Sequence, residues 1–190
     1  SALEDGYALA ERTRDRWGPD PVNIAARCNV PVIHSEDDAG FGSTIVHAEY
    51  RTRPPAITLY LPAIRHLDWL VSEQVAQARF GIDSTAPIFL AHEPYHHFDC
   101  TDARGPIARR HVVTVIRLGR WRWTSGVRAL AEIAAGAFAQ QLLGLSFHPK
   151  VLDLLLLGEK QNLSTQRTQR DAKEGVGLRE SRTQTASNVA

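Results

Sequence analysis

The chain has 190 residues, of which 43% are hydrophobic and 23% charged, and its formal net charge is +1. This length allows one domain with a hydrophobic core, and the near-neutral charge gives no reason to expect a nucleic acid or an anionic membrane as a partner. Two cysteines are too few for a disulfide framework. No apolar run approaches the roughly 18 residues of a membrane helix, and the first residues lack the apolar core of a signal peptide. We therefore expect a globular protein of the cytoplasm.

The first part of the chain predicts two helices. Leu3 to Trp17 shows apolar residues at helical spacing, and the Gly-Pro pair that follows ends this helix. Residues 21–30 predict a short second helix, with Asp20 as its N-cap.

Three strand candidates and a longer helix come next. The strand candidates are residues 30–34, 43–51 and 56–61, and two consecutive prolines separate the last two. A helical pattern then extends from residue 63 to residue 81, where a glycine ends it.

The second half of the chain contains one undecided segment and two further helices. Residues 86–98 fit a strand or a helix, and residues 109–123 predict a strand in their first half. The alanine-rich segment 124–144 predicts a helix closed by its final glycine, and residues 148–158 predict a short helix. This order of elements indicates an α+β fold with a small sheet rather than a doubly wound fold.

The composition changes after Gly158. Residues 159–190 are dominated by charged residues and by Gln, Asn, Ser and Thr, and they contain no aromatic residue. Such a segment has too few apolar side chains to fold alone. We therefore predict one domain over residues 1–158 and a flexible polar tail over residues 159–190.

The segment FLAHEPYHHFDC, residues 89–100, contains a pattern typical of zinc peptidases. His92, Glu93 and His96 fit H-E-x-x-H. On a helix the two histidines lie one turn apart on the same face, where two neutral imidazoles can hold one Zn²⁺. Glu93 is rotated by about 100° from His92, so it can take a proton from a zinc-bound water without ligating the metal. A motif this short also arises by chance, and the alternative is a polar, histidine-rich helix end.

Two acidic residues are candidates for a third ligand. Glu132 lies 36 residues after His96 on a predicted helix, and small residues on the same face would allow close packing against the helix of His92. Burying this carboxylate without a partner would be costly, and a metal ion would resolve that cost. Asp102 is the second candidate, because it occupies the last ligand position of the longer pattern H-E-x-x-H-x-x-G-x-x-H. The alternative for Glu132 is an exposed carboxylate on an ordinary helix.

The two motifs together resemble the ImmA/IrrE family of zinc metallopeptidases, which pairs an H-E-x-x-H helix with a later helix of pattern E-x-x-A-x-x-F-A-x-x-L-L. Glu132 begins this second pattern here, and the other matching residues are Ala135, Phe138, Ala139, Leu142 and Leu143. Upstream, DPVNIAARCNVPVIH resembles the family's short helix followed by a strand, and AITLYL resembles the strand that precedes the helix leading into the metal motif. The likeness covers roughly residues 3–157.

The resemblance implies a zincin-like core in which His92, His96 and Glu132 hold Zn²⁺ and Glu93 is the general base. Family members with known substrates cleave helix-turn-helix repressors, which releases genes for stress response or mobile-element transfer. The implied function is therefore a zinc-dependent endopeptidase that acts on a protein partner, such as a repressor, without binding nucleic acid or a membrane. The alternatives are a non-catalytic binding module descended from the family and, less well supported, a metal sensor.

Pro94 departs from the family pattern, in which a helix former is usual at this position. Proline inside a helix costs about 3 kcal/mol, because it lacks an N–H and its ring clashes with the preceding turn. One possibility is a helix that begins near His92, which places Pro94 harmlessly in the first turn. The other is a kink that moves His92 relative to His96. The spacing from His96 to Glu132 is also longer than usual, which indicates an inserted strand or loop at residues 101–125.

Other side chains near the motif receive less specific predictions. His97 lies off the face of the two ligands, so we expect a packed or solvent-exposed histidine. Cys100 lies nearer to that face, but a small buried hydrophobe is the expected role. Candidates for stabilising an oxyanion, which the sequence does not rank, are Tyr95, Arg110, His111 and His148.

Overall fold

The computed structural model describes residues 1–41, 44–73, 81–110, 112–118 and 121–159. The chain divides into two units, Ser1–Val151 and Leu152–Ala190. In the second unit, the described residues 152–159 are helical. The predicted polar tail, residues 159–190, therefore lies outside the described residues except for Glu159. The end of the predicted helix 63–81 also lies outside them, at residues 74–80.

The first unit begins with two helices, as predicted. Helix α1 (Ala2–Trp17) starts at a capping box, in which the Ser1 side chain accepts the Glu4 N–H and the Glu4 carboxylate accepts from the Ser1 amino group. Helix α2 (Pro21–Arg27) starts at Asp20, whose carboxylate accepts a backbone N–H of the first turn at 3.0 Å. The predicted N-cap at Asp20 is therefore confirmed.

A three-stranded sheet follows, with the order β1-β5-β4, and a separate pair is formed by β2 and β3. Strand β1 is parallel to β5, whereas β4 is antiparallel to β5 and forms one edge of the sheet. The predicted strand 43–51 is divided in two, β3 and β4. The strands are β1 (Val32–Ser35), β2 (Gly40–Phe41), β3 (Thr44–Ile45), β4 (Ala48–Thr52) and β5 (Pro55–Tyr60).

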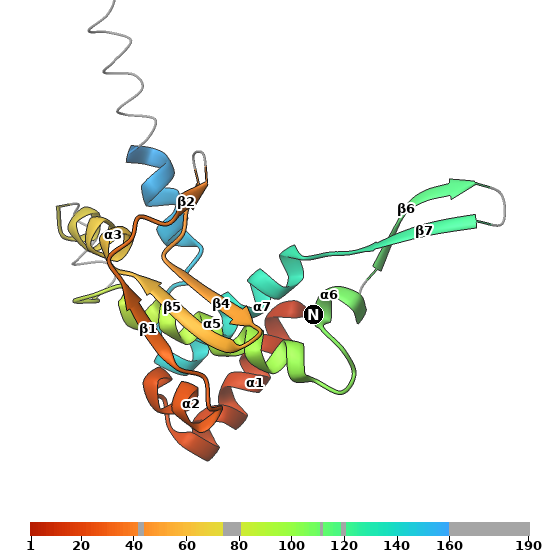
Figure 1. Cartoon of the computed structure of the whole chain (residues 1–190), viewed down its shortest axis with the longest axis horizontal. Coiled ribbons are helices and arrows are strands. Elements are labelled where there is room, and N and C mark those ends of the chain that lie inside the picture. Colours follow the sequence, from red (N-terminus) through yellow and green to blue (C-terminus); the bar gives the residue numbers. More distant parts are fainter. Residues whose placement is uncertain (42–43, 74–80, 111, 119–120, 160–190) are drawn as a thin grey trace, which may run out of the picture. The chain divides into compact units, whose positions relative to one another are not determined.

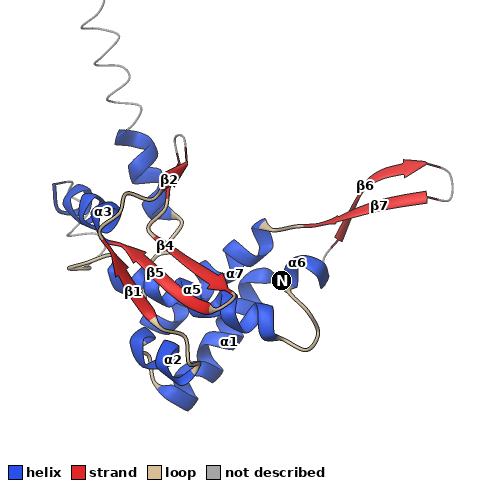
Figure 2. Ribbon diagram, in the orientation of Figure 1, coloured by secondary structure: helices blue, strands red, loops and turns tan. Residues whose placement is uncertain are grey.

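The remaining elements are mainly helical (Figure 1). They are α3 (Leu61–Glu73), α5 (Ala86–Thr101), α6 (Ile107–Arg110), the antiparallel pair β6 (Val112–Leu118) and β7 (Trp121–Gly126), and α7 (Ala129–Leu143). The undecided segment 86–98 is thus helical. As predicted, Gly144 ends α7, in a left-handed conformation with φ 66° that glycine adopts without strain. The first unit combines helices with a small sheet, which confirms the α+β class (Figure 2).

Helix α5 packs on β4 and β5 on one side and on α7 on another. On the sheet side, Leu90 joins a buried cluster with Ile57 and Leu59. On the α7 side, the ring of Phe138 lies 6.1 Å from the rings of both Tyr95 and Phe98. This central position fixes α5 by apolar burial on two sides.

Helix α1 approaches α7 closely. A Cβ added at Gly6 would clash with the backbone oxygen of Ala134 and lie 2.9 Å from the Cβ of Ala137. Only a glycine leaves room for this contact. None of the helices in the described ranges has the length and apolar character that a membrane crossing requires.

Candidate metal centre

Helix α5 begins at Ala86, six residues before the first histidine of the motif. A residue of another helix accepts hydrogen bonds at this start. One carboxylate oxygen of Asp68, on α3, accepts both the backbone N–H and the hydroxyl of Thr85 at 2.7 Å. The other oxygen accepts the Ser84 hydroxyl at 3.0 Å. Pro87 suits this first turn, where its missing N–H costs nothing. Asp68 lies 17 residues before Thr85, the N-cap residue, so no local pattern indicates this support.

Pro94 therefore lies inside α5, and the possibility of a helix that begins near His92 is not observed. The proline is fully buried, and it cannot donate to the carbonyl of Leu90 as another residue would. The two histidines nevertheless stay together, with their Nε2 atoms 3.1 Å apart. The alternative of a kink that separates the two ligands is thus not observed.

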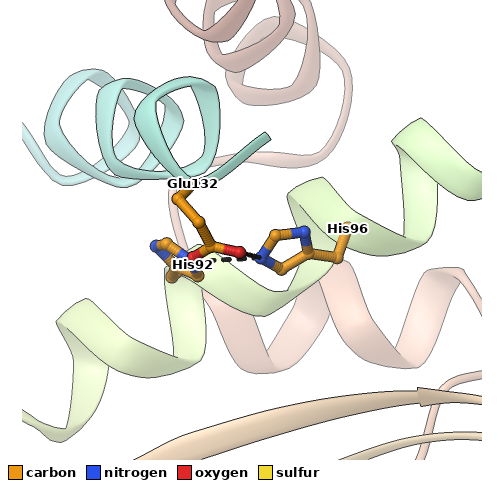
Figure 3. A group of neighbouring side chains, drawn as sticks. All are labelled: His92, His96 and Glu132. Carbon is orange, nitrogen blue, oxygen red and sulfur yellow. Dashed lines mark hydrogen bonds and ion pairs between the residues drawn. The ribbon is translucent and has the colours of Figure 1, made fainter. Parts of the chain in front are cut away.

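Glu132 completes a group of three convergent side chains (Figure 3). One of its carboxylate oxygens lies 3.3 Å from Nε2 of His92, and the other lies 3.7 Å from Nε2 of His96. Tetrahedral zinc with bonds of 2.0–2.1 Å separates its ligand atoms by about 3.4 Å. The three separations, 3.1, 3.3 and 3.7 Å, lie around this value. The group therefore fits a metal ion with two imidazole ligands and one carboxylate.

The Glu132 side chain is 61% exposed, so of the two alternatives the exposed one is observed. It lies in the first turn of α7, where the helix dipole favours a negative charge. The hydrogen bond from His92 lowers the pKa of Glu132 despite partial burial. The carboxylate is thus ionised at neutral pH, the form that binds a metal.

His96 is held in the neutral form. Burial and the charge of His92 together lower its pKa to about 4, although the charge of Glu132 acts in the opposite direction. A metal ligand must be a neutral imidazole, so His96 is ready to bind at physiological pH without losing a proton.

Glu93 is not one of the three convergent side chains, and it is only 6% exposed. Burial raises its pKa to about 7, and the charge of Glu132 adds to this. The charge of His92 and the backbone N–H of Tyr50 act in the opposite direction. A carboxyl group with a pKa near neutrality is suited to exchange protons at physiological pH.

Three other residues of this region do not join the group. His97 is packed, as predicted, with its Nδ1 atom 2.9 Å from the Tyr50 hydroxyl. Cys100 is exposed, so the prediction of a buried hydrophobe is wrong. Asp102, the second candidate for third ligand, binds the guanidinium of Arg104 at 2.8 Å instead.

The candidates for stabilising an oxyanion are in different environments. Tyr95 is 2% exposed and lies in the hydrophobic core. Arg110 lies 3.6 Å from the carboxylate of Asp99, and His111 lies outside the described residues. Among the four, this leaves His148 as the candidate with a free ring nitrogen in the described part of the chain.

The ring of His148 packs over Gly136, one helical turn after Glu132, where a Cβ would lie 2.7 Å from its Nε2. Gly136 thus makes room for the imidazole. Nδ1 of His148 accepts the Lys150 N–H at 3.2 Å, and its Nε2 is buried with no hydrogen-bond partner among the described residues. The signal that sequence reasoning missed was a glycine inside a helix, which costs about 1 kcal/mol relative to alanine.

No family model matches the chain, and neither the curated proteins nor the solved structures include a match. The resemblance to the ImmA/IrrE family therefore stays a prediction from the sequence. What the structure adds is an α+β unit with a group of two histidines and a glutamate that could hold a metal ion.

Proposed function

We propose that this chain is a cytoplasmic zinc-dependent endopeptidase with a zincin-like core, related to the ImmA/IrrE family. In this proposal His92, His96 and Glu132 hold Zn²⁺ and Glu93 is the general base. The observation that carries the proposal is the spacing of the three ligand atoms, 3.1 to 3.7 Å, beside a buried carboxyl group of raised pKa. Two histidines and a glutamate are a ligand set of catalytic zinc, which keeps its fourth position open for water or substrate.

When bound, zinc would polarise the scissile carbonyl and make a water molecule acidic enough to attack it. Glu93 takes the proton of the attacking water as the new C–O bond forms. The protonated Glu93 then donates this proton to the leaving nitrogen as the C–N bond breaks. The pKa of about 7 lets one carboxyl group perform both transfers near neutral pH.

A protein substrate follows from the family resemblance, and a helix-turn-helix repressor is the proposed class. The net charge of +1 gives no electrostatic reason for the chain to bind nucleic acid itself. The proposed partner is therefore the repressor protein rather than its operator DNA.

The test is cleavage of a repressor encoded beside the gene, followed by mass spectrometry, together with the zinc content of the purified protein. The wild type should bind one zinc and cleave the repressor. Glu93→Gln should keep the zinc and lose about 10²-fold or more in rate, because it removes the proton acceptor. Glu36→Gln is the matched control, since this surface glutamate pairs with Arg65 instead. Full activity of Glu93→Gln, or a wild type without zinc, would contradict the proposal.

A second candidate is a metal-binding module without catalysis, and Pro94 inside α5 is the observation that favours it. A proline in the helix that carries the ligands destabilises that helix, and the proposed catalysis does not require it. In this case the wild type binds zinc but cleaves no repressor, and Glu93→Gln behaves as the wild type does.

A further inference from the structure

A cavity of about 210 Å³ lies between helices α1 and α5, and none of the three residues of the metal group lines it. Both helices pack on α7, and each contributes residues three or four positions apart, which share one face of a helix. From α1 these are Asp5, Leu9 and Arg12, and from α5 they include Tyr95, Phe98 and Asp99. Sites for drug-sized molecules measure about 300–1,000 Å³, so this cavity suits a smaller metabolite.

Tyr95 brings a buried hydroxyl to this cavity. The residue is only 2% exposed, and its hydroxyl forms no hydrogen bond with any residue that the structure describes. Buried polar groups nearly always have a hydrogen-bond partner. The partner of this hydroxyl is therefore a molecule in the cavity.

Two arginines at the cavity have unused hydrogen-bond donors. Arg12 makes no hydrogen bond or ion pair within the described ranges. Arg110 lies 3.6 Å from Asp99, and its buried Nε has no acceptor among the described residues. The third arginine, Arg104, binds Asp102 at 2.8 Å. A guanidinium with free N–H groups binds a carboxylate or a phosphate well, so the cavity favours an anion over water.

Two of the three carboxylates that line the cavity already have partners. Asp99 accepts the backbone N–H of Ile107 at 2.7 Å, and Asp102 accepts from Arg104. Asp5, in the first turn of α1, is the lining carboxylate without a hydrogen bond in the described part of the chain. Its negative charge opposes a bound anion, which gives a substitution of Asp5 a predictable sign.

We propose that this cavity binds a small carboxylate with an apolar body. The carboxylate oxygens accept from the Tyr95 hydroxyl and the Arg12 guanidinium, while the apolar body packs against Leu9 and Phe98. Arg110 adds a second positive charge at the same cavity. This binding does not depend on the proposed peptidase function, because the cavity and the metal group share no residue.

The test is titration of the full chain with phenylacetate and with hexanoate, followed by NMR and by isothermal titration calorimetry. Both carboxylates should bind with a Kd of about 1 mM or below. The largest shifts should occur at the amides of Leu9, Arg12 and Phe98. The affinity should be the same with zinc and with EDTA, because the carboxylate does not bind to the metal.

Four variants locate the site. Arg12→Gln and Tyr95→Phe each remove a hydrogen bond to a charged group and should weaken binding about 10-fold or more. Tyr95→Phe should not unfold at a lower urea concentration than the wild type, since its hydroxyl has no protein partner to lose. Asp5→Asn removes the opposing charge and should strengthen binding. Arg16→Gln makes the same charge change on the same helix outside the cavity, so it should keep the wild-type affinity.

Two further probes separate the charge from the apolar body. Inorganic phosphate lacks the apolar body and 2-phenylethanol lacks the charge, so each should bind at least about 10-fold more weakly than phenylacetate. Equal losses in Arg12→Gln and Arg16→Gln would reduce the binding to unspecific attraction and overturn the proposal. Shifts that need zinc and centre on His92 and Glu132 would place the carboxylate on the metal and overturn it too. So would the absence of binding at about 10 mM of either carboxylate, which would leave water as the only occupant.

Discussion

Helix α7 meets helices α1 and α5 in different ways. Against α1, Ala134 and Ala137 leave just enough room for Gly6, and the contact is closely packed. Towards α5, the exposed carboxylate of Glu132 reaches two imidazole nitrogens at 3.3 and 3.7 Å. The first contact stabilises the fold by burial, whereas the second contributes little stability because it is accessible to water. One helix thus separates folding from metal binding, and substitutions at its two contacts should have separate effects.

The largest difference between the effect on zinc binding and the effect on stability is expected for a substitution of Glu132. Glu132→Gln removes a ligand, so it should weaken zinc binding by at least about 100-fold, the upper range for residues that only orient a ligand. The side chain is 61% exposed, so the unfolding free energy of the metal-free protein should change by less than about 0.5 kcal/mol. Zinc titration against a chelator and urea unfolding with EDTA measure the two effects. Zinc affinity close to that of the wild type would exclude Glu132 as a ligand.

The buried Glu93 makes the stability of the metal-free protein depend on pH. Its pKa is about 7 in the folded protein and near the ordinary 4.5 when unfolded. Between these values the folded state holds a proton that the unfolded state has lost, so stability falls as pH rises and the loss is complete above 7. Glu93→Gln should therefore gain about 3 kcal/mol relative to the wild type between pH 4 and pH 8. Urea unfolding at both pH values with EDTA checks this. An equal difference at both values would show that the pKa is not raised.

The contact between α1 and α7 is tested by Gly6→Ala. Alanine favours a helix by up to about 1 kcal/mol over glycine, yet here its Cβ would clash with the Ala134 backbone. Overpacking of this kind costs about 1–3 kcal/mol. Gly158→Ala is the control, since an added Cβ there meets nothing within 4 Å, and its stability should be unchanged or slightly higher. If Gly6→Ala unfolds at the same urea concentration as the wild type, the close contact between α1 and α7 is contradicted.

The smallest effect is expected at the start of α5. Asp68→Ala leaves the N–H and hydroxyl of the buried Thr85 without their acceptor, which should cost about 1 kcal/mol, as for other lost helix caps. Asp68→Asn keeps one oxygen acceptor and should lose less. Urea unfolding of the three proteins measures the order. If Asp68→Asn unfolded at a lower urea concentration than Asp68→Ala, this role of Asp68 would be contradicted.

Local sequence signals predicted the helix ends that are capped by residues next to them in the sequence. Asp20 caps the helix that directly follows it, and Gly144 ends the helix that precedes it. The pairing of Glu132 with the two histidines was expected from two motifs and their family register. The structure brings these three residues together, which spacing alone did not require.

The misses have a common physical cause, which is contact between residues distant in the sequence. The start of α5 is supported by Asp68 of another helix, so the sequence left open whether Pro94 lies in the first turn or inside the helix. The exposure of Cys100 depends on which elements cover α5. The buried ring of His148 depends on Gly136. None of these contacts leaves a periodic pattern in the sequence.

The most direct measurement is X-ray absorption spectroscopy of the zinc-loaded protein, with the metal counted per chain. The geometry of His92, His96 and Glu132 predicts one zinc with nitrogen and oxygen ligands at about 2.0–2.1 Å, two of them imidazoles. Glu132→Gln should lose this spectrum or alter it. A chain that binds no zinc, or a ligand shell with sulfur at about 2.3 Å from the exposed Cys100, would contradict the proposed metal centre.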